Sequence, residues 1–159
     1  MIHHAGLIAL RRGGSWIGAL IRGPSGSGKS DLALRALEAG FRLVADDRVI
    51  LWRCEGRLYG RAPEALHGRI EVRAVGIERR PALPMSRVVA VVDCALKPTD
   101  PPRLPEPISV VVEGVALPVL DLWPFEPSAA LKLQCSICHI GQAAQDGYQA
   151  VLAFPRNMT

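Results

Sequence analysis

Residues 23–30 read GPSGSGKS and match G-x-x-x-x-G-K-[ST], the loop that binds nucleotide phosphates. Trp16–Ile21 is an apolar β-type run directly before this loop, and apolar residues recur after Lys29 at the spacing of one helix face. Gly40 occupies the position of a helix C-terminal glycine, and Arg42–Ala45 predicts another strand. Strand, glycine-rich loop, helix and strand in this order predict a nucleotide phosphate site rather than an accidental glycine-rich turn.

The residues of the loop have separate expected roles. The backbone N–H groups from Gly26 to Ser30 are expected to bind the β-phosphate, aided by the positive end of the following helix. Lys29 is expected to reach the β- and γ-phosphates, and the Ser30 hydroxyl to bind Mg²⁺. The candidate nucleotide-binding residues are Gly23, Pro24, Ser25, Gly26, Ser27, Gly28, Lys29 and Ser30.

Asp46 and Asp47 end the strand that follows the predicted helix. Adjacent side chains of a regular strand point to opposite faces, so at most one of them would then face a metal. At a strand end both can reach the site, and two close carboxylates have pKa values that are pushed apart. The pair is therefore either a proton acceptor beside a magnesium-supporting group, or one metal-facing aspartate and one surface aspartate. The pattern leaves both open and names no phosphate acceptor.

The remaining sequence predicts further short elements and one domain over residues 1–159. The expected elements are a hairpin of Leu7–Leu10 with Trp16–Ile21, strands at Val49–Arg53, Ile70–Ile77 and Arg87–Cys94, a helical turn at Pro63–His67, a hairpin at Ile108–Leu120 turning at Glu113-Gly114, and a helix at Ser128–Ile140. Residues 100–107 hold four prolines and predict a loop, and the tail from Gly141 is left unassigned.

The composition excludes several classes of protein. With 49% hydrophobic and 21% charged residues, the 159-residue chain is typical of a soluble globular domain. Its net charge of +4 is too small to indicate nucleic-acid binding. No apolar run reaches the length of a membrane span, and Met1–Leu10 lacks the pattern of a secretory signal. We therefore expect a cytoplasmic protein.

Cysteines occur at Cys54, Cys94, Cys135 and Cys138, and are expected to be thiols. The sequence from Cys135 to His139 is C-x-x-C-H, the pattern of c-type haem attachment. It also lies in an apolar, helix-compatible run, where cysteines often serve as small buried hydrophobes. We favour the core interpretation because haem attachment requires export, and a structural zinc site lacks a second close pair of ligands.

Two stretches together indicate a family. Residues 23–47, GPSGSGKSDLALRALEAGFRLVADD, resemble the phosphate loop, helix and Asp-Asp strand of bacterial HPr kinase/phosphorylase. Residues 69–77, RIEVRAVGI, resemble the second signature of that family, and APEAL at residues 62–66 also fits it. The resemblance extends from His4 to about Ile77. It implies an α/β P-loop fold like that of PEP carboxykinase, with a mixed central sheet.

The resemblance also implies a function. Members of the family use ATP and Mg²⁺ to phosphorylate a serine of the phosphocarrier protein HPr, and many reverse this reaction with inorganic phosphate. Long members are hexamers, so a homo-oligomer is expected. The residues to which the resemblance assigns roles are Lys29 (phosphate binding), Ser30 and Glu71 (magnesium ligands), Asp47 (proton acceptor), Asp46 (its neighbour), Arg73 (the same strand as Glu71), His4 (the family histidine) and Arg103 (the flexible-loop arginine).

The sequence departs from the family pattern in two places. The catalytic part begins at once, as in the short form of alphaproteobacteria. Trp123–Ser128, WPFEPS, lacks the arginine that the family uses in dephosphorylation, which disfavours the phosphorylase reaction. Two alternatives remain: a P-loop small-molecule kinase, and a non-catalytic ATP-sensing module that binds HPr. We favour catalysis because simple nucleotide binding requires neither the aspartate pair nor Glu71.

Overall fold

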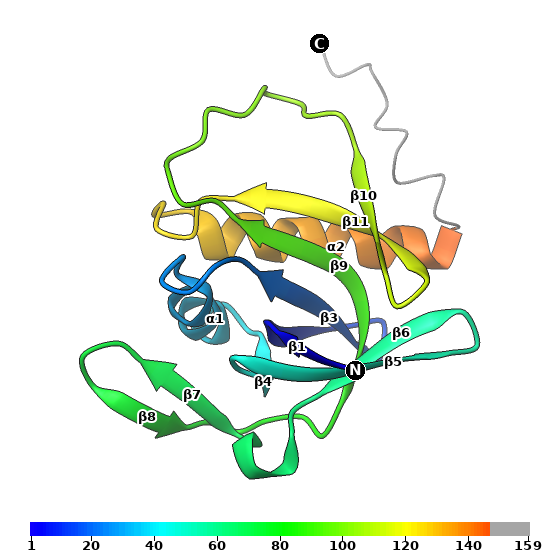
Figure 1. The fold of residues 1–159 in the computed structure, drawn as a ribbon. Coiled ribbons are helices and arrows are strands. Elements are labelled where there is room, and N and C mark those ends of the chain that lie inside the picture. The colour runs from blue at the N-terminus through cyan, green and yellow to red at the C-terminus, as the bar shows by residue number, and fades with distance from the viewer. Residues whose placement is uncertain (147–159) are drawn as a thin grey trace.

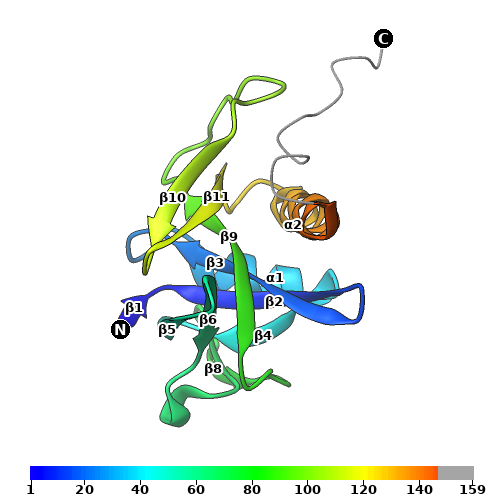
Figure 2. The same ribbon diagram turned by 90° about the vertical axis from the view of Figure 1, so that its right-hand side faces the viewer.

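The computed structural model describes residues 1–146, with side chains as far as Ile140. Helices α1 (Lys29–Glu38) and α2 (Ala129–Asp146) pack together on one face of a curled mixed sheet (Figures 1 and 2). The strands are β1 (Ile2–His4), β2 (Gly6–Arg12), β3 (Ser15–Arg22), β4 (Arg42–Ala45), β5 (Arg48–Cys54), β6 (Arg57–Arg61), β7 (Arg69–Val72), β8 (Gly76–Arg79), β9 (Ser86–Cys94), β10 (Ile108–Val112) and β11 (Val115–Leu122). A 3₁₀ turn, η1, covers Glu64–Leu66.

Strand β9 is the centre of the main sheet, whose order is β1-β5-β6-β9-β3-β2-β4. Along one side β9 pairs in parallel with β3. Along its other side it pairs antiparallel with β6 over its first residues and parallel with β11 over its last. The sheet therefore divides into two branches beyond β9, and β7 with β8 forms a separate hairpin.

Alternation along the strands produces two apolar layers. In β2, Ile8 packs in the layer beneath the helices, whereas its neighbour Leu7 packs with Leu51 and Leu58 of β5 and β6 in the other layer. All four side chains are buried to 1% exposure or less, and each burial contributes roughly 1.5–3 kcal/mol. The two layers fix the position of β3, whose end carries the glycine-rich loop.

Most of the expected elements are confirmed. The β2–β3 and β10–β11 hairpins, α1, β4, β5, β9 and the turn η1 lie where the sequence places them, and residues 100–107 form no helix or strand. Gly40 has φ +94°, the left-handed conformation expected after a helix. Helix α2 begins as expected and continues to Asp146, while the rest of the unassigned tail, residues 147–159, lies outside the described residues.

The expectation of one strand over Ile70–Ile77 is wrong. The chain reverses at residues 73–75 to form the β7–β8 hairpin, in which Glu71 pairs with Ile77. Ala74 has φ +64°, a conformation that a non-glycine residue rarely adopts, so no sequence signal marked this turn. Arg73 therefore lies in a turn rather than in a strand with Glu71. Strands β1 and β6 were also not anticipated.

No helix in the described part of the chain has both the length and the apolar character needed to cross a membrane.

Candidate active site

The glycine-rich loop joins β3 to α1 and has the backbone that its glycines permit. Gly26 has φ +78° and Gly28 φ +96°, values in the left-handed region that favours glycine. A Cβ at Gly26 would meet no atom within 4 Å, so the loop is open there. The hydroxyl of Ser27 is buried and has no hydrogen-bond partner among the described residues. A buried, unpartnered hydroxyl in an open loop at a helix start is consistent with a site for an anionic ligand.

Lys29 is held at this loop by its own backbone. Its Nζ donates to the carbonyl oxygens of Gly23 at 2.8 Å and Pro24 at 3.0 Å, and the residue is only 8% exposed. A charged side chain this buried requires partners, and the two carbonyls supply them. The ammonium group is thus fixed beside the N–H groups at the start of α1.

Asp46 is buried and connects the start of α1 to β7. Its Oδ1 accepts a hydrogen bond from the Ser30 hydroxyl at 2.8 Å, and its Oδ2 accepts one from the backbone N–H of Glu71 at 2.9 Å. Burial raises the pKa of Asp46, while these two hydrogen bonds act in the opposite direction. The carboxyl group therefore positions Ser30 and Glu71, the two residues expected to bind magnesium.

Asp47 follows directly, yet its side chain lies on the wall of the site. Its φ of +64° turns the chain, and its carbonyl accepts a hydrogen bond from the backbone N–H of Ala5 at 3.1 Å. Its Oδ1 lies 2.6 Å from Nε2 of His4, and its Oδ2 lies 3.4 Å from Nε of Arg48. Asp46 is thus buried against Ser30 while Asp47 is exposed beside His4, and the choice between the two arrangements that the sequence left open stays a prediction.

His4 reaches Asp47 because β1 pairs antiparallel with β5, in a register that places His4 opposite Arg48. The adjacent His3 points elsewhere, with Nε2 2.8 Å from Oε1 of Glu113 in the β10–β11 turn. The strand therefore separates the two histidines, and only His4 meets the aspartate pair.

Most of these residues line one cavity of about 520 Å³, but the buried Ser27 and Asp46 do not. It is lined by His4, Ser25, Gly26, Gly28, Lys29, Ser30, Asp31, Leu34, Asp47, Glu71, Val72, Arg73 and Phe125. The sequence had singled out nine of these positions. It missed Asp31, Leu34, Val72 and Phe125, of which Phe125 has the clearest signal, an aromatic residue between two prolines just before a helix.

Arg103 is not among the residues that line the cavity. It lies exposed in the loop between β9 and β10, which Figures 1 and 2 show on the opposite side of the molecule from the β7–β8 hairpin. Nothing in the described structure brings this arginine to the phosphate loop.

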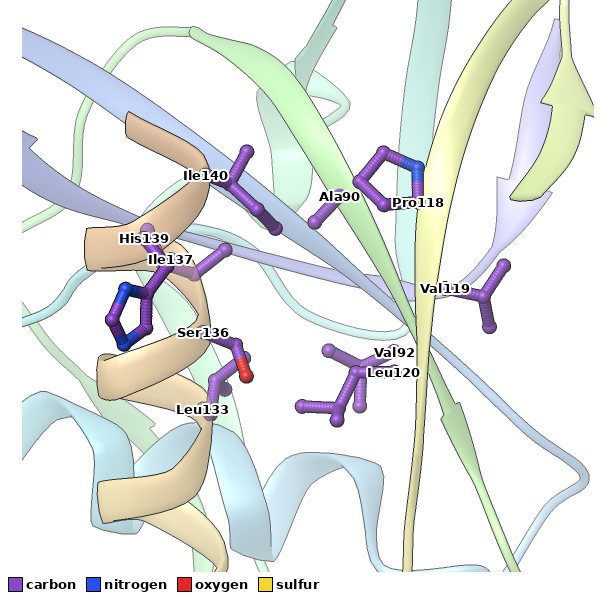
Figure 3. Close-up of a pocket in the computed structure, with 10 residues that line it drawn as sticks. All are labelled: Ala90, Val92, Pro118, Val119, Leu120, Leu133, Ser136, Ile137, His139 and Ile140. Carbon is purple, nitrogen blue, oxygen red and sulfur yellow. The ribbon is translucent and has the colours of Figure 1, made fainter. Parts of the chain in front are cut away.

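A second cavity, of about 180 Å³, lies between α2 and strands β9 and β11 (Figure 3). Leu133, Ile137 and Ile140 of α2 border it on one side, and Ala90 and Val92 of β9 on the other. Its lining is mostly aliphatic, so it offers no group of residues suited to phosphate chemistry.

The cysteines near this cavity only partly fit the core interpretation. Cys138 packs against the apolar layer beneath the helices, but Cys135 is exposed, so the expectation that both are buried is wrong. The i, i+3 spacing on a helix leaves Cys135 at the solvent edge of the buried stripe. Among the described residues, no three His, Cys, Asp or Glu side chains cluster as a metal site.

Comparison with known proteins agrees with this geometry. A family model described as "HPr Serine kinase C-terminal domain" matches residues 4–79. The HPr kinase/phosphorylase of Clostridium tetani is 49% identical over 67 residues, covering 42% of this chain and 22% of that protein. That of Clostridium perfringens (strain SM101) is 51% identical over 61 residues, covering 38% of this chain and 20% of that protein. The matches span about a fifth of the length of these relatives.

A solved structure extends the likeness to the rest of the fold. The Hpr(Ser) kinase/phosphatase from Coxiella burnetii aligns with a TM-score of 0.76 at 21% sequence identity, covering 92% of this chain and 99% of that one. The expected P-loop fold like that of PEP carboxykinase, with a mixed sheet, is thereby confirmed. The alignment reaches beyond residue 79, into the part of the chain that the sequence matches do not cover.

Proposed function

Because the model of the HPr serine kinase C-terminal domain matches residues 4–79, we propose that this chain is an ATP- and Mg²⁺-dependent kinase that phosphorylates a serine of the phosphocarrier protein HPr. One observation carries the proposal. The His4–Asp47 pair, at 2.6 Å, lines the same cavity as Lys29 and Ser30. A proton acceptor for a hydroxyl group and a cradle for phosphates thus face one space.

The loop suits a nucleoside triphosphate. The loop is open at Gly26, the Ser27 hydroxyl has no partner among the described residues, and the ammonium of Lys29 lies at the start of α1, so donors are available to an anion. Lys29 offsets the negative charge that builds up on the transferred phosphoryl group.

The donors around Ser30 suit magnesium. Mg²⁺ prefers oxygen ligands and is usually held by one or two protein groups together with substrate phosphates. The Ser30 hydroxyl and the Glu71 carboxylate would hold it, and Asp46 keeps both residues in place. When bound, the ion neutralises charge on the β- and γ-phosphates.

Asp47 serves as the base of the reaction. It takes the proton of the seryl hydroxyl as the seryl oxygen forms its bond to the γ-phosphorus and the bond to the β–γ bridging oxygen breaks, with ADP as the leaving group. His4 hydrogen-bonds the same carboxylate and holds it in one orientation. Arg73, on the cavity wall, adds positive charge on the acceptor side.

The reverse phosphorylase reaction, a hexameric or other homo-oligomeric state, cytoplasmic location and regulation of the phosphotransferase system and of carbon metabolism stay predictions. The role of Arg103 at the γ-phosphate also stays a prediction, and it requires the loop that carries Arg103 to move to the phosphate site. The likeness to proteins named HPr kinase/phosphorylase supports testing the reverse reaction directly.

The test is transfer of labelled phosphate from Mg·ATP to purified HPr of the same organism, followed by mass mapping of the modified residue. We expect phosphoserine on HPr. Asp47→Asn is expected to lower kcat by about 10²- to 10⁴-fold, the typical contribution of a general base, while Mg·ATP still binds. Asp121→Asn, an exposed aspartate of β11 outside the cavity, is the matched control and should transfer at the wild-type rate.

Three results would contradict the proposal in different ways. Wild-type transfer rates in Asp47→Asn would remove Asp47 as the base. ATP binding without transfer to folded HPr would favour the nucleotide-sensing module, and transfer to a small molecule would favour the alternative kinase. Adding inorganic phosphate to phosphorylated HPr, and measuring pyrophosphate release, tests the reverse reaction.

A further inference from the structure

Phe125 is an exposed aromatic residue placed directly on the phosphate loop. It is 48% exposed, although it lines the cavity together with Gly28, Lys29 and Ser30. A Cβ at Gly28 would lie 2.8 Å from Cζ of Phe125. Glycine at position 28 thus permits both the turn of the loop and the close approach of this ring. The ring is thus accessible from the cavity.

The segment that carries Phe125 is held firmly. Arg35 of α1 donates to the carbonyl oxygens of Pro124 and Glu126, and its Nε lies 3.0 Å from Oδ2 of Asp31. Lys132 Nζ lies 2.6 Å from the Glu126 carboxylate.

Among the described residues, one aromatic side chain neighbours the ring. Trp123 packs against it edge-on, with ring centroids 6.3 Å apart and planes at 69°. The backbone bonds and this edge contact together fix the ring before any ligand binds, which is what a stacking surface requires.

Phe125 lies on the side of α1 away from Glu71 and Arg73, the residues proposed to hold magnesium and to face the protein acceptor. It comes from the connection between β11 and α2, which Figures 1 and 2 show above α1. Glu71 and Arg73 come from the β7–β8 hairpin, which lies below α1 in both views. A nucleoside triphosphate bound along the loop has its γ-phosphate at one end and its base at the other. If the γ-phosphate points toward the acceptor side at β7, the base of the nucleotide lies on the side of Phe125.

We propose that Phe125 is the surface on which the base of the bound nucleoside triphosphate stacks. This inference rests on the proposed function, since it assumes that the loop binds such a ligand. Every base presents a π-face, and the described residues that line the cavity include no asparagine or glutamine side chain that could pair with one base in particular. Stacking therefore supplies affinity with little discrimination, and adenine and guanine nucleotides are expected to bind with similar strength.

The experiment measures binding of Mg·ATP, Mg·GTP and inorganic tripolyphosphate to the full chain by calorimetry. Phe125→Ala and Phe125→Leu should weaken both nucleotides by about 5- to 150-fold, the typical effect of removing one stacked ring, and leave tripolyphosphate unchanged. Phe125→Tyr keeps a ring and should bind like the wild type. Leu131→Ala, which changes an exposed apolar residue of α2 outside the cavity, is the control.

Several outcomes would overturn the inference. Unchanged nucleotide affinity, with a raised KM for the protein acceptor, would make Phe125 a contact for that protein. An equal loss for tripolyphosphate would show that the ring only shapes the loop, and full affinity in Phe125→Leu would show that apolar bulk suffices. If the wild type binds neither ATP nor tripolyphosphate, the proposed function itself fails, and this is visible before any variant is made.

Discussion

Two substitutions of Asp46 distinguish its contribution to the stability of the fold from its contribution to metal binding. In Asp46→Ala the Ser30 hydroxyl and the Glu71 N–H both lose their acceptor. A buried donor without a partner lowers the free energy of unfolding by about 1–3 kcal/mol. For the half-buried Ser30 hydroxyl the loss is at the low end of this range, because the hydroxyl can rotate toward water. Loss of a carboxylate whose ionised form burial disfavours offsets part of this. We expect a net loss of about 1–3 kcal/mol in the free energy of unfolding.

Asp46→Asn should behave differently. Its Oδ1 can accept from the Glu71 N–H, and its amide N–H₂ can donate to the Ser30 oxygen, so both bonds persist with the Ser30 bond reversed. Stability should then stay within about 1 kcal/mol of the wild type. The Ser30 oxygen, however, now accepts a hydrogen bond and is a poorer ligand for a cation. Mg²⁺-dependent ATP binding should weaken although the protein is folded.

The assay combines thermal unfolding with nucleotide binding. For a chain of this size 1 kcal/mol shifts Tm by about 2–4 °C, so Asp46→Ala should lower Tm by about 2–12 °C. Tripolyphosphate binding without Mg²⁺ should be unaffected in Asp46→Asn. An unchanged Tm in Asp46→Ala would refute the connecting role of Asp46. Wild-type Mg·ATP affinity in Asp46→Asn would refute the link between this carboxyl group and the metal.

Three further predictions concern the surroundings of the site. Gly28→Ala should lower the free energy of unfolding by about 1–3 kcal/mol and abolish ATP binding, because φ +96° and the ring of Phe125 exclude a Cβ. The loss of stability should be smaller when Phe125 is also replaced by Ala. Denaturation measures the stability and calorimetry the ATP binding. His4→Ala should lower kcat by about tenfold with an unchanged KM for ATP in steady-state kinetics, since it removes one solvent-screened bond to Asp47. Burial raises the pKa of Cys94 from 9.0 to about 11, so its thiolate at pH 8 is about a hundredfold scarcer and a disulfide reagent should modify exposed Cys54 first. Because the pKa of Cys94 is raised only in the folded protein, the protonated thiol stabilises the fold fully below pH 9, and this stabilisation is lost as the pH rises toward 11. Alkaline unfolding curves of Cys94→Ala should not show this loss.

The sequence by itself determined the phosphate loop. The loop, helix α1 and the Asp46-Asp47 turn are contiguous, and their conformation follows from local rules: left-handed glycines, helical periodicity and a strand end. The same local character explains why the β2–β3 and β10–β11 hairpins were predicted. The turn at Ala74 was not predicted, because no local preference of alanine favours a positive φ. Only the packing of the β7–β8 hairpin reveals this turn.

The tertiary structure decided which of the candidate residues meet. His4 approaches Asp47 only through the β1–β5 register, and Glu71 approaches Asp46 only because β7 packs beside α1. Phe125 reaches Gly28 because α2 packs beside α1, while the loop of Arg103 leads away from the cavity. Contacts of this kind depend on how sheets and helices stack over long sequence separations, and that information is distributed over the whole core. The local sequence therefore determines the conformation of the glycine-rich loop, and the packing of the two apolar layers determines what surrounds it.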